Sequence, residues 1–175
     1  MNQKYFYISI FLIFALFLSG CNSVIVGNPE IDIEVETKRV EDAVHDFWSF
    51  IDAQDENNAA WACAPGYDYG SVIRPATEQF VEPYFEQLDY IKNVCGTTKV
   101  IVDIYAYIRD ISFIGDESGN PRAIIDIQVN RTIMNCGVLN NTIYRFGTME
   151  LIYCDIEPYW EDGWYVENVD IDLWN

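Results

Sequence analysis

Residues 99–134 read KVIVDIYAYIRDISFIGDESGNPRAIIDIQVNRTIM, and they decide the fold. Two runs rich in β-branched and aromatic residues flank the turn-forming segment at 115–121, which predicts two antiparallel strands. Pairing the runs around that segment gives one face with the pairs Ile108–Ile127, Ala106–Val129 and Val102–Ile133. The other face then carries Tyr107 opposite Gln128 and Arg109 opposite Asp126. One apolar and one polar face are typical of an antiparallel sheet that buries a single side.

Two more strand patterns follow, at about 142–157 and 163–173. A turn at 139–141 is expected to place Val129 opposite Leu151 and Ile127 opposite Tyr153. In the last strand the apolar residues change parity, which predicts a β-bulge near Glu167.

The segment before these strands has helical periodicity. Its apolar residues between 40 and 51 form one stripe, made of Val40, Ala43, Val44, Phe47, Trp48 and Ile51. Asp55 is a good N-cap for a short helix at 56–64, a loop is expected at 65–72, and a third helix covers about 76–93. Helices followed by an antiparallel meander predict an α+β domain, with N-terminal helices packed on a curved antiparallel sheet of about four long strands.

The N-terminus has the pattern of an export signal. Residues 1–21 read MNQKYFYISIFLIFALFLSGC, with one lysine, an apolar run too short for a stable membrane span, and small residues at the end. The final four residues resemble the lipobox of prokaryotic lipoproteins, which implies that Cys21 is acylated and becomes the first mature residue. We therefore expect a lipid anchor on the extracytoplasmic face of the cell membrane. Residues 22–38 are expected to be an acidic tether, and 39–175 the folded domain.

Composition excludes several classes of function. The chain has 28 acidic and 10 basic residues, a formal net charge of −18, so nucleic acid is not an expected partner. A single histidine and the cysteine spacing predict no zinc site, and the acidic runs lack the spacing of a Ca²⁺ loop. No phosphate-binding loop is present, and no cofactor is predicted.

Four cysteines remain after Cys21, a number that suggests two disulfides in an exported protein. In the strand register above, Cys136 lies near residue 99, only a few residues from Cys95. A Cys95–Cys136 bridge is therefore predicted. Cys63 and Cys154 are left either bridged to each other or unpaired.

Three segments together resemble one family. FWSFIDAQDENNAAWACA (47–64), PRAIIDIQVNRT (121–132) and EDGWYVENVDI (161–171) are similar to the opening helices, middle strand and closing strand of nuclear-transport-factor-2-like proteins, the cystatin-like cone superfamily. The resemblance spans about residues 40–173. It implies a cone of helices on a bent sheet with an internal cavity. Some members are enzymes, such as ketosteroid isomerase and scytalone dehydratase, and many are binding or dimerisation modules.

Strand parity selects the candidate ligand-binding residues. Arg131 falls on the apolar face, where it could bind an anionic ligand, although a salt bridge at the rim is the simpler alternative. Tyr153 and Asp155 share the inward parity, and Tyr67, with Tyr69 and Tyr84, is expected near the mouth of the cone.

An Asp and a Tyr in an apolar cavity are the groups that isomerase-type members use. Their catalytic positions do not match this chain residue by residue, so no catalytic residue is predicted. His45 is on the polar side of the first helix, where solvation is a better explanation than general-base catalysis. Non-enzymatic binding of a small molecule or a protein is therefore the leading prediction, with an enzyme as the alternative.

The outer sheet face is a second candidate site. It is expected to carry Tyr105, Tyr107, Met134 and Ile152 among polar residues, a mixture that suits an interface as well as it suits a solvated face. Likewise, Arg109 and Asp126 form either a recognition pair or an ordinary surface pair. A homodimer through this face is one partner that the sequence allows.

Overall fold

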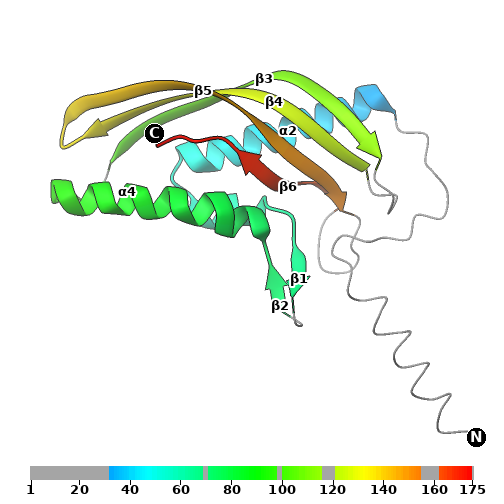
Figure 1. Cartoon of the computed structure of the whole chain (residues 1–175), viewed down its shortest axis with the longest axis horizontal. Helices are drawn as coiled ribbons and strands as arrows, with labels where there is room; N and C mark the ends of the chain where they lie inside the picture. Colours follow the sequence, from blue (N-terminus) through cyan, green and yellow to red (C-terminus); the bar gives the residue numbers. More distant parts are fainter. Residues whose placement is uncertain (1–31, 69–70, 98–99, 116–120, 155–161, 175) are drawn as a thin grey trace, which may run out of the picture.

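The computed structural model in Figure 1 describes residues 32–68, 71–97, 100–115, 121–154 and 162–174. Its elements, in chain order, are α2 (Ile33–Asp52), α3 (Glu56–Trp61), β1 (Gly66–Asp68), β2 (Ser71–Ile73), the π-helix η1 (Thr77–Val81), α4 (Glu82–Cys95), β3 (Ile101–Gly115), β4 (Pro121–Asn135), β5 (Val138–Cys154) and β6 (Gly163–Asp170). Helices followed by a four-stranded antiparallel sheet confirm the predicted α+β class.

Helix α2 begins earlier than predicted. Its N-cap is Asp32, whose side chain accepts a hydrogen bond from the Val35 amide. Glu34 and Glu36 in the first turn stabilise the helix, because their negative charge lies at the positive end of the helix dipole. Residues 33–38, expected to be the end of the tether, are therefore helical. The first turns also contact the sheet, since Trp164 Nε1 donates to Glu36 Oε2 at 2.7 Å. The predicted apolar stripe is confirmed, with Val40, Val44, Phe47, Trp48 and Ile51 buried.

The following segment was predicted in part. Asp55 caps α3 as expected, accepting from the Asn58 amide at 3.1 Å, but the helix ends at Trp61. The expected loop at 65–72 is wrong, because β1 and β2 pair there as a short hairpin in which Tyr67 lies opposite Val72. The third helix is confirmed, and it begins with the wide turns of η1.

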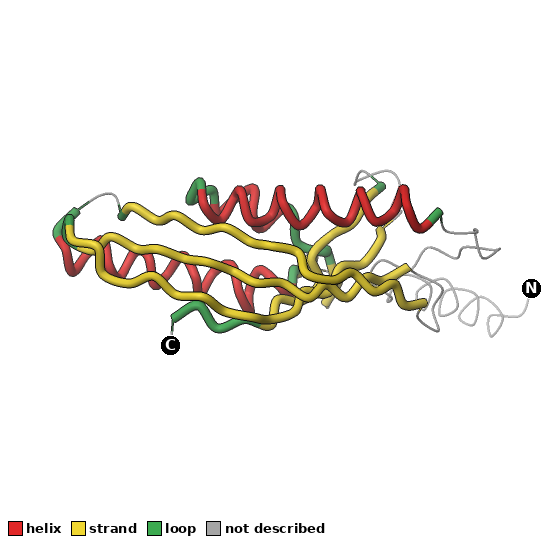
Figure 2. Tube along the Cα trace, turned by 90° about the horizontal axis from the view of Figure 1, so that it is seen from above, coloured by secondary structure: helices red, strands yellow, loops and turns green. Residues whose placement is uncertain are grey.

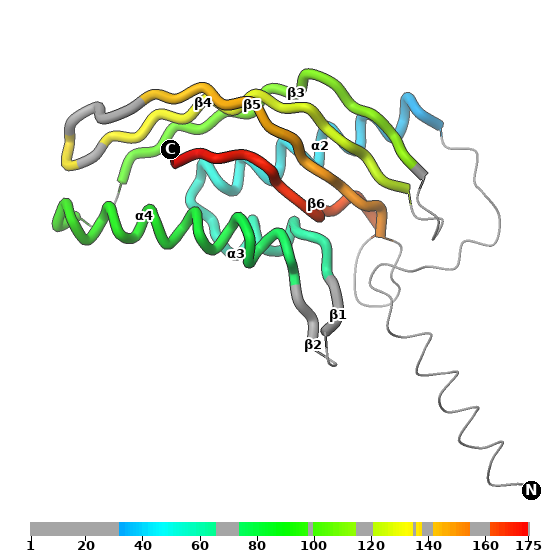
Figure 3. The backbone as a smooth tube through the Cα atoms, in the orientation of Figure 1, coloured from blue at the N-terminus to red at the C-terminus, as the bar shows by residue number. Residues whose placement is uncertain are grey.

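The four long strands form one sheet in the order β3-β4-β5-β6. Figures 1 and 3 show the sheet curving over α4, with α2 alongside and the short β1–β2 hairpin projecting away from the body. Figure 2 shows how far the strands extend along the helices. Among the described residues, no helix is long and apolar enough to cross a membrane.

The β3–β4 register is as predicted from Val102 to Ile108, where it shifts at a β-bulge. Asp110, not Arg109, therefore lies opposite Asp126, and the predicted Arg109–Asp126 pair is wrong. The predicted bulge at Glu167 is confirmed by the register shift there, and Arg122 donates to the Glu167 carboxylate at 2.9 Å.

The predicted β4–β5 register is wrong. The chain turns at Cys136 and Gly137, before the expected turn at 139–141, and Val129 therefore lies opposite Arg145 and Ile127 opposite Gly147. Both turn residues have positive φ, 49° and 79°, which is the backbone of the two-residue turn whose twist matches a β-hairpin.

The predicted Cys95–Cys136 disulfide is confirmed, with the two Cα atoms 5.0 Å apart. It joins the end of α4 to the β4–β5 turn. Cys63 is a buried free thiol, so the Cys63–Cys154 bridge left open by the sequence does not form.

The space between the sheet and the helices is filled by side chains. Phe47 and Trp48 of α2 pack with Phe80 and Tyr84 of the η1–α4 segment, and Trp48 Nε1 donates to Met149 Sδ of β5. Three places among the described residues are candidates for function: one buried polar cluster, one groove and the outer sheet face.

Candidate functional site

The buried polar cluster surrounds Arg131, which points into the core as predicted. Its side chain is 3% exposed, and its guanidinium carbon lies 4.3 Å from the ring centroid of Trp174. Nε and Nη1 have no hydrogen-bond partner, and no salt bridge forms within the described part of the chain. The expected rim salt bridge is therefore wrong, and the ring of Trp174 takes the place of a carboxylate.

Tyr84 completes this cluster. The sequence placed it near the mouth of the cone, but it is 1% exposed and its hydroxyl lacks a hydrogen-bond partner. Burial raises the pKa of Tyr84 well above its usual range, while the nearby Arg131 charge opposes that shift. Burial also lowers the pKa of Arg131, against the effect of Tyr84. We call Tyr84, Arg131 and Trp174 the Arg131 cluster.

The chain after β6 brings Trp174 to this cluster by crossing close over β5. A Cβ added to Gly147 would lie 2.3 Å from the Asp170 carbonyl oxygen, so only glycine permits this approach. Trp174 then packs against Tyr84, with ring centroids 5.3 Å apart. Neither contact has a local signal in the sequence.

The described residues of the cluster offer hydrogen-bond donors and no buried carboxylate. Among the described residues, Arg131 is the only buried charged side chain, and the two carboxylates that act electrostatically on the cluster, Asp52 and Asp172, are exposed. The pairing of a buried Asp with a Tyr that isomerase chemistry needs is thus not assembled there. Asp155, the predicted partner, lies outside the described residues.

The other predicted ligand residues lie elsewhere. Tyr153 is partly buried, as its parity predicted, and packs edge-on against Trp164 at 5.7 Å. Arg131 pairs with Ile143, and from there to Tyr153 is roughly 33 Å of extended strand. Tyr67 lies in the projecting β1–β2 hairpin. The structure therefore does not bring Arg131, Tyr153 and Tyr67 into one site.

Tyr153 instead lines a groove of about 700 Å³ between α2, α3 and the start of β6. Sequence reasoning missed this groove because its walls come from four separate elements. Its aromatic lining consists of Phe50, Trp61, Tyr153, Trp164 and Tyr165.

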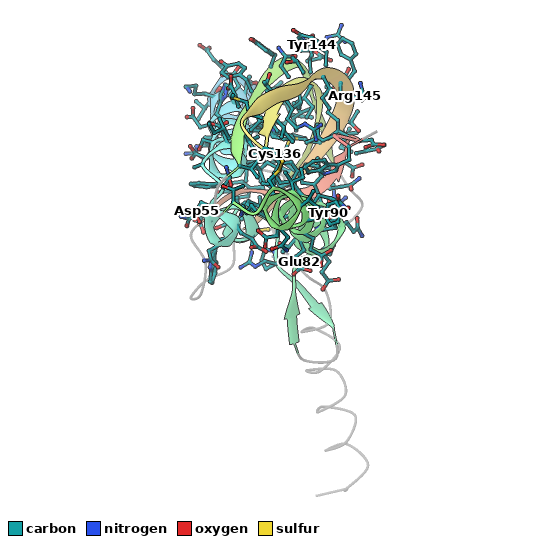
Figure 4. All side chains as sticks on the ribbon, turned by 90° about the vertical axis from the view of Figure 1, so that its left-hand side faces the viewer. Asp55, Glu82, Tyr90, Cys136, Tyr144 and Arg145 are labelled. Atoms are coloured by element: carbon teal, nitrogen blue, oxygen red, sulfur yellow. A yellow bond between two sulfur atoms is a disulfide. The ribbon has the colours of Figure 1, made fainter. Side chains whose placement is uncertain are left out.

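The outer sheet face is an exposed aromatic ladder. Two cross-strand rows build it, with an amide of β4 between two aromatic rings in each, and the rows are Tyr105–Asn130–Tyr144 and Tyr107–Gln128–Phe146. The four aromatic side chains are 47–63% exposed. In Figure 4, Tyr144 and Arg145 lie on the far side of the domain from Tyr90 and α4.

One residue predicted for this face does not belong to the exposed ladder. Ile152 is only 5% exposed, because it packs with Ala64, Cys154 and Tyr165. Sequence reasoning also missed Tyr144 and Phe146, whose alternation in TIYRFGT at 142–148 was the available signal. The Arg109 guanidinium carbon lies 5.0 Å from the Phe146 ring centroid, so this arginine of β3 reaches across β4 to a ring of β5 and does not pair with Asp126.

Two further observations concern metal-binding groups and His45. Within the described residues, no group of three or more histidine, cysteine, aspartate or glutamate side chains is placed to hold an ion. His45 is exposed on α2, as predicted.

Comparison with known proteins gives structural neighbours only. No family model and no curated protein matches the sequence. The chain is similar to Aln2 from a Streptomyces species, at 9% identity over 83% of this chain and 94% of that one, with a TM-score of 0.48. It is also similar to a Nostoc punctiforme protein of unknown function with a cystatin-like fold. The identity is 13% over 79% of this chain and 92% of that one, and the TM-score is 0.45. Membership in the nuclear-transport-factor-2-like superfamily stays a prediction from the residues.

Proposed function

We propose that this chain is a lipid-anchored, extracytoplasmic interaction module that binds a second copy of itself through the aromatic ladder. The observation that carries the proposal is the set of four aromatic side chains, 47–63% exposed, on one face of the sheet. Contiguous exposed apolar surface of this kind marks interaction sites, and tyrosine, phenylalanine and arginine are enriched at them. The aromatic packing of Phe47, Trp48 and Phe80 between the helices and the sheet favours this function over binding inside the cone.

Charge favours a second copy as the partner. The chain carries a net charge of −18, yet the two rows of the ladder contain no charged residue. One of the 10 basic residues, Arg109, stacks on the Phe146 ring of the ladder, whereas Arg145 has the opposite parity and lies across from the buried Val129. A two-fold contact would bring Arg109 of each copy near the acidic residues of the other copy, such as Asp103 and Asp110, and reduce the repulsion between two acidic chains.

Phe146→Glu is expected to convert a dimer into a monomer, because it places a carboxylate in the middle of an apolar contact. Sedimentation velocity or native mass spectrometry on residues 24–175 measures the change. Tyr90→Glu is the matched control, since Tyr90 is 64% exposed on α4, away from the sheet face, and should leave the dimer intact. A wild-type chain that stays monomeric at about 100 μM would contradict the proposal, because specific dimers usually have dissociation constants below that concentration.

A second function, binding of a small carboxylate at the Arg131 cluster, is favoured by one observation. Arg131 keeps two unpartnered N–H groups in the core, next to the unpartnered hydroxyl of Tyr84. An arginine side chain binds a carboxylate through two parallel hydrogen bonds, so these groups match that ligand. Trp174 covers the guanidinium and would have to move aside.

Arg131→Met is expected to raise the free energy of unfolding by about 1–2 kcal/mol, because it replaces a buried unpaired charge with an apolar chain of similar length. Urea unfolding checks this. Acetate or benzoate should then raise the melting temperature of the wild type and leave that of the variant unchanged. Arg109→Met, on the surface, should change stability by less than about 0.5 kcal/mol. A large loss of stability in Arg131→Met would make Arg131 a structural residue.

A further inference from the structure

The groove beside α2 has an aromatic wall made by residues far apart in the chain. Trp61 ends α3 and is 58% exposed, while Tyr153 and Trp164 meet edge-on across β5 and β6. Its volume, about 700 Å³, is within the range of small-molecule sites. The groove is separate from the Arg131 cluster and from the aromatic ladder.

The charged residues of the groove are mainly acidic. Three carboxylates line it, those of Asp42, Asp46 and Asp162, against one lining cation, Arg39, and a second cation, Arg74, that stacks on Trp61. Arg39 is neutralised by Glu36 at 3.0 Å, and Asp42 by Lys38. Within the described residues, Asp46 and Asp162 have no ion-pair partner, so the groove keeps negative charge beside its aromatic wall.

The aromatic wall already binds a cation of the chain itself. The Arg74 guanidinium carbon lies 4.6 Å from the ring centroid of Trp61, which is a cation–π distance. Arg74 also donates to the Cys63 carbonyl, so its position is held by the backbone as well. Trp61 is therefore part of a surface that favours positive charge.

We propose that this groove binds an organic cation, with an ammonium group against the aromatic wall and Asp46 and Asp162 as counter-charges. Aromatic rings attract a cation through the negative face of their π system, and nearby carboxylates add a Coulombic attraction that salt screens. The net charge of the chain, −18, would further concentrate cations around it. A neutral molecule of the same shape would gain neither attraction.

The test is a titration of residues 24–175 with choline. The NMR chemical shifts of the tryptophan indole N–H groups report binding at each step of the titration. The neutral control ligand is 3,3-dimethylbutan-1-ol, which has the shape of choline without its charge. Choline is expected to bind about tenfold more tightly than the alcohol, and raising NaCl from about 20 to 500 mM should weaken only choline. Equal affinity for both compounds, or no shift with choline, would overturn the proposal.

Two pairs of variants locate the site. Trp61→Leu should weaken choline binding about tenfold, whereas Tyr90→Leu, at an equally exposed aromatic on α4, should leave it unchanged. Asp46→Asn should weaken it about threefold, whereas Asp103→Asn on β3 should not. The exchanged residues are exposed, so circular dichroism should show an intact fold. Unchanged affinity in both groove variants would place choline elsewhere and overturn the proposal.

Discussion

Cys21→Ala is expected to abolish the incorporation of labelled palmitate into the protein completely. The reason is chemical, because acylation of a prokaryotic lipoprotein begins with a thioether on the sulfur of the cysteine that ends the lipobox, and no other side chain here can replace it. The measurement is growth of an expressing bacterium with labelled palmitate, followed by mass spectrometry of the N-terminal peptide. Wild-type protein should start at Cys21 and carry the lipid.

Cys63→Ala is the matched control, since it removes a buried thiol and should leave palmitate incorporation unchanged. A second arm replaces residues 1–21 with an ordinary cleaved secretory signal, which should release the domain from the membrane fraction. Wild-type protein without palmitate would contradict lipidation. So would a peptide with Cys21 in a disulfide, for example with Cys154, because the thioether and the disulfide need the same sulfur atom.

The sheet could be predicted from the sequence because its pattern is local and repeated. Alternation along residues 99–134 determines which side chains face inward, and Ile108, Ile127 and Val129 lie on the inner face as predicted. Arg131 was placed in the core by the same parity. Side chains alternate between the two faces of a strand wherever the strand begins and ends. The assignments of inward-facing residues are therefore correct although the predicted strand bounds were not exact.

The β4–β5 register was predicted wrongly because the turn was assigned to the wrong residues. Asparagine is common in turns, and the pair Asn140 and Asn141 is the reason why the turn was predicted at 139–141. The chain turns instead at Cys136, whose positive φ of 49° is uncommon for a residue other than glycine, asparagine or aspartate. Its bridge to Cys95 holds that turn against α4.

The candidate sites were predicted less well than the fold, because they depend on contacts between distant residues. Trp174 reaches Arg131 only through the close crossing at Gly147. Glu36 and Trp164 are 128 residues apart, and their hydrogen bond ties the first turn of α2 to β6 at the edge of the groove. Neither periodicity nor spacing carries such information.

Removal of the Cys95–Cys136 bridge is expected to lower the free energy of unfolding by about 4 kcal/mol. The bridge closes a loop of 41 residues, and cross-linking a loop of that length restricts the unfolded chain by about this amount. For a domain of this size, that corresponds to a fall in melting temperature of about 12 °C. The bridge also joins the end of α4 to the β4–β5 turn.

The variant to use is Cys95→Ala with Cys136→Asn. Asparagine tolerates positive φ, and Asn-Gly is a favoured pair for a two-residue hairpin turn, so the turn at 136–137 should keep its backbone. The measured change then comes from the lost cross-link and not from a strained turn. Urea unfolding at two wavelengths would show whether the transition remains two-state.

A reducing agent provides the internal control for this experiment. On residues 24–175, which lack Cys21, it should destabilise the wild type by about the same 4 kcal/mol and leave the double variant unchanged, because only the wild type has the Cys95–Cys136 bridge to lose. Cys63→Ala should respond to the reductant as the wild type does, since Cys63 is a free thiol. Equal stability of reduced and oxidised wild type would mean that the reduced chain already holds α4 against the turn. The packing of α4 through Tyr84, Phe85 and Leu88 would then position the β4–β5 hairpin without help from the bridge.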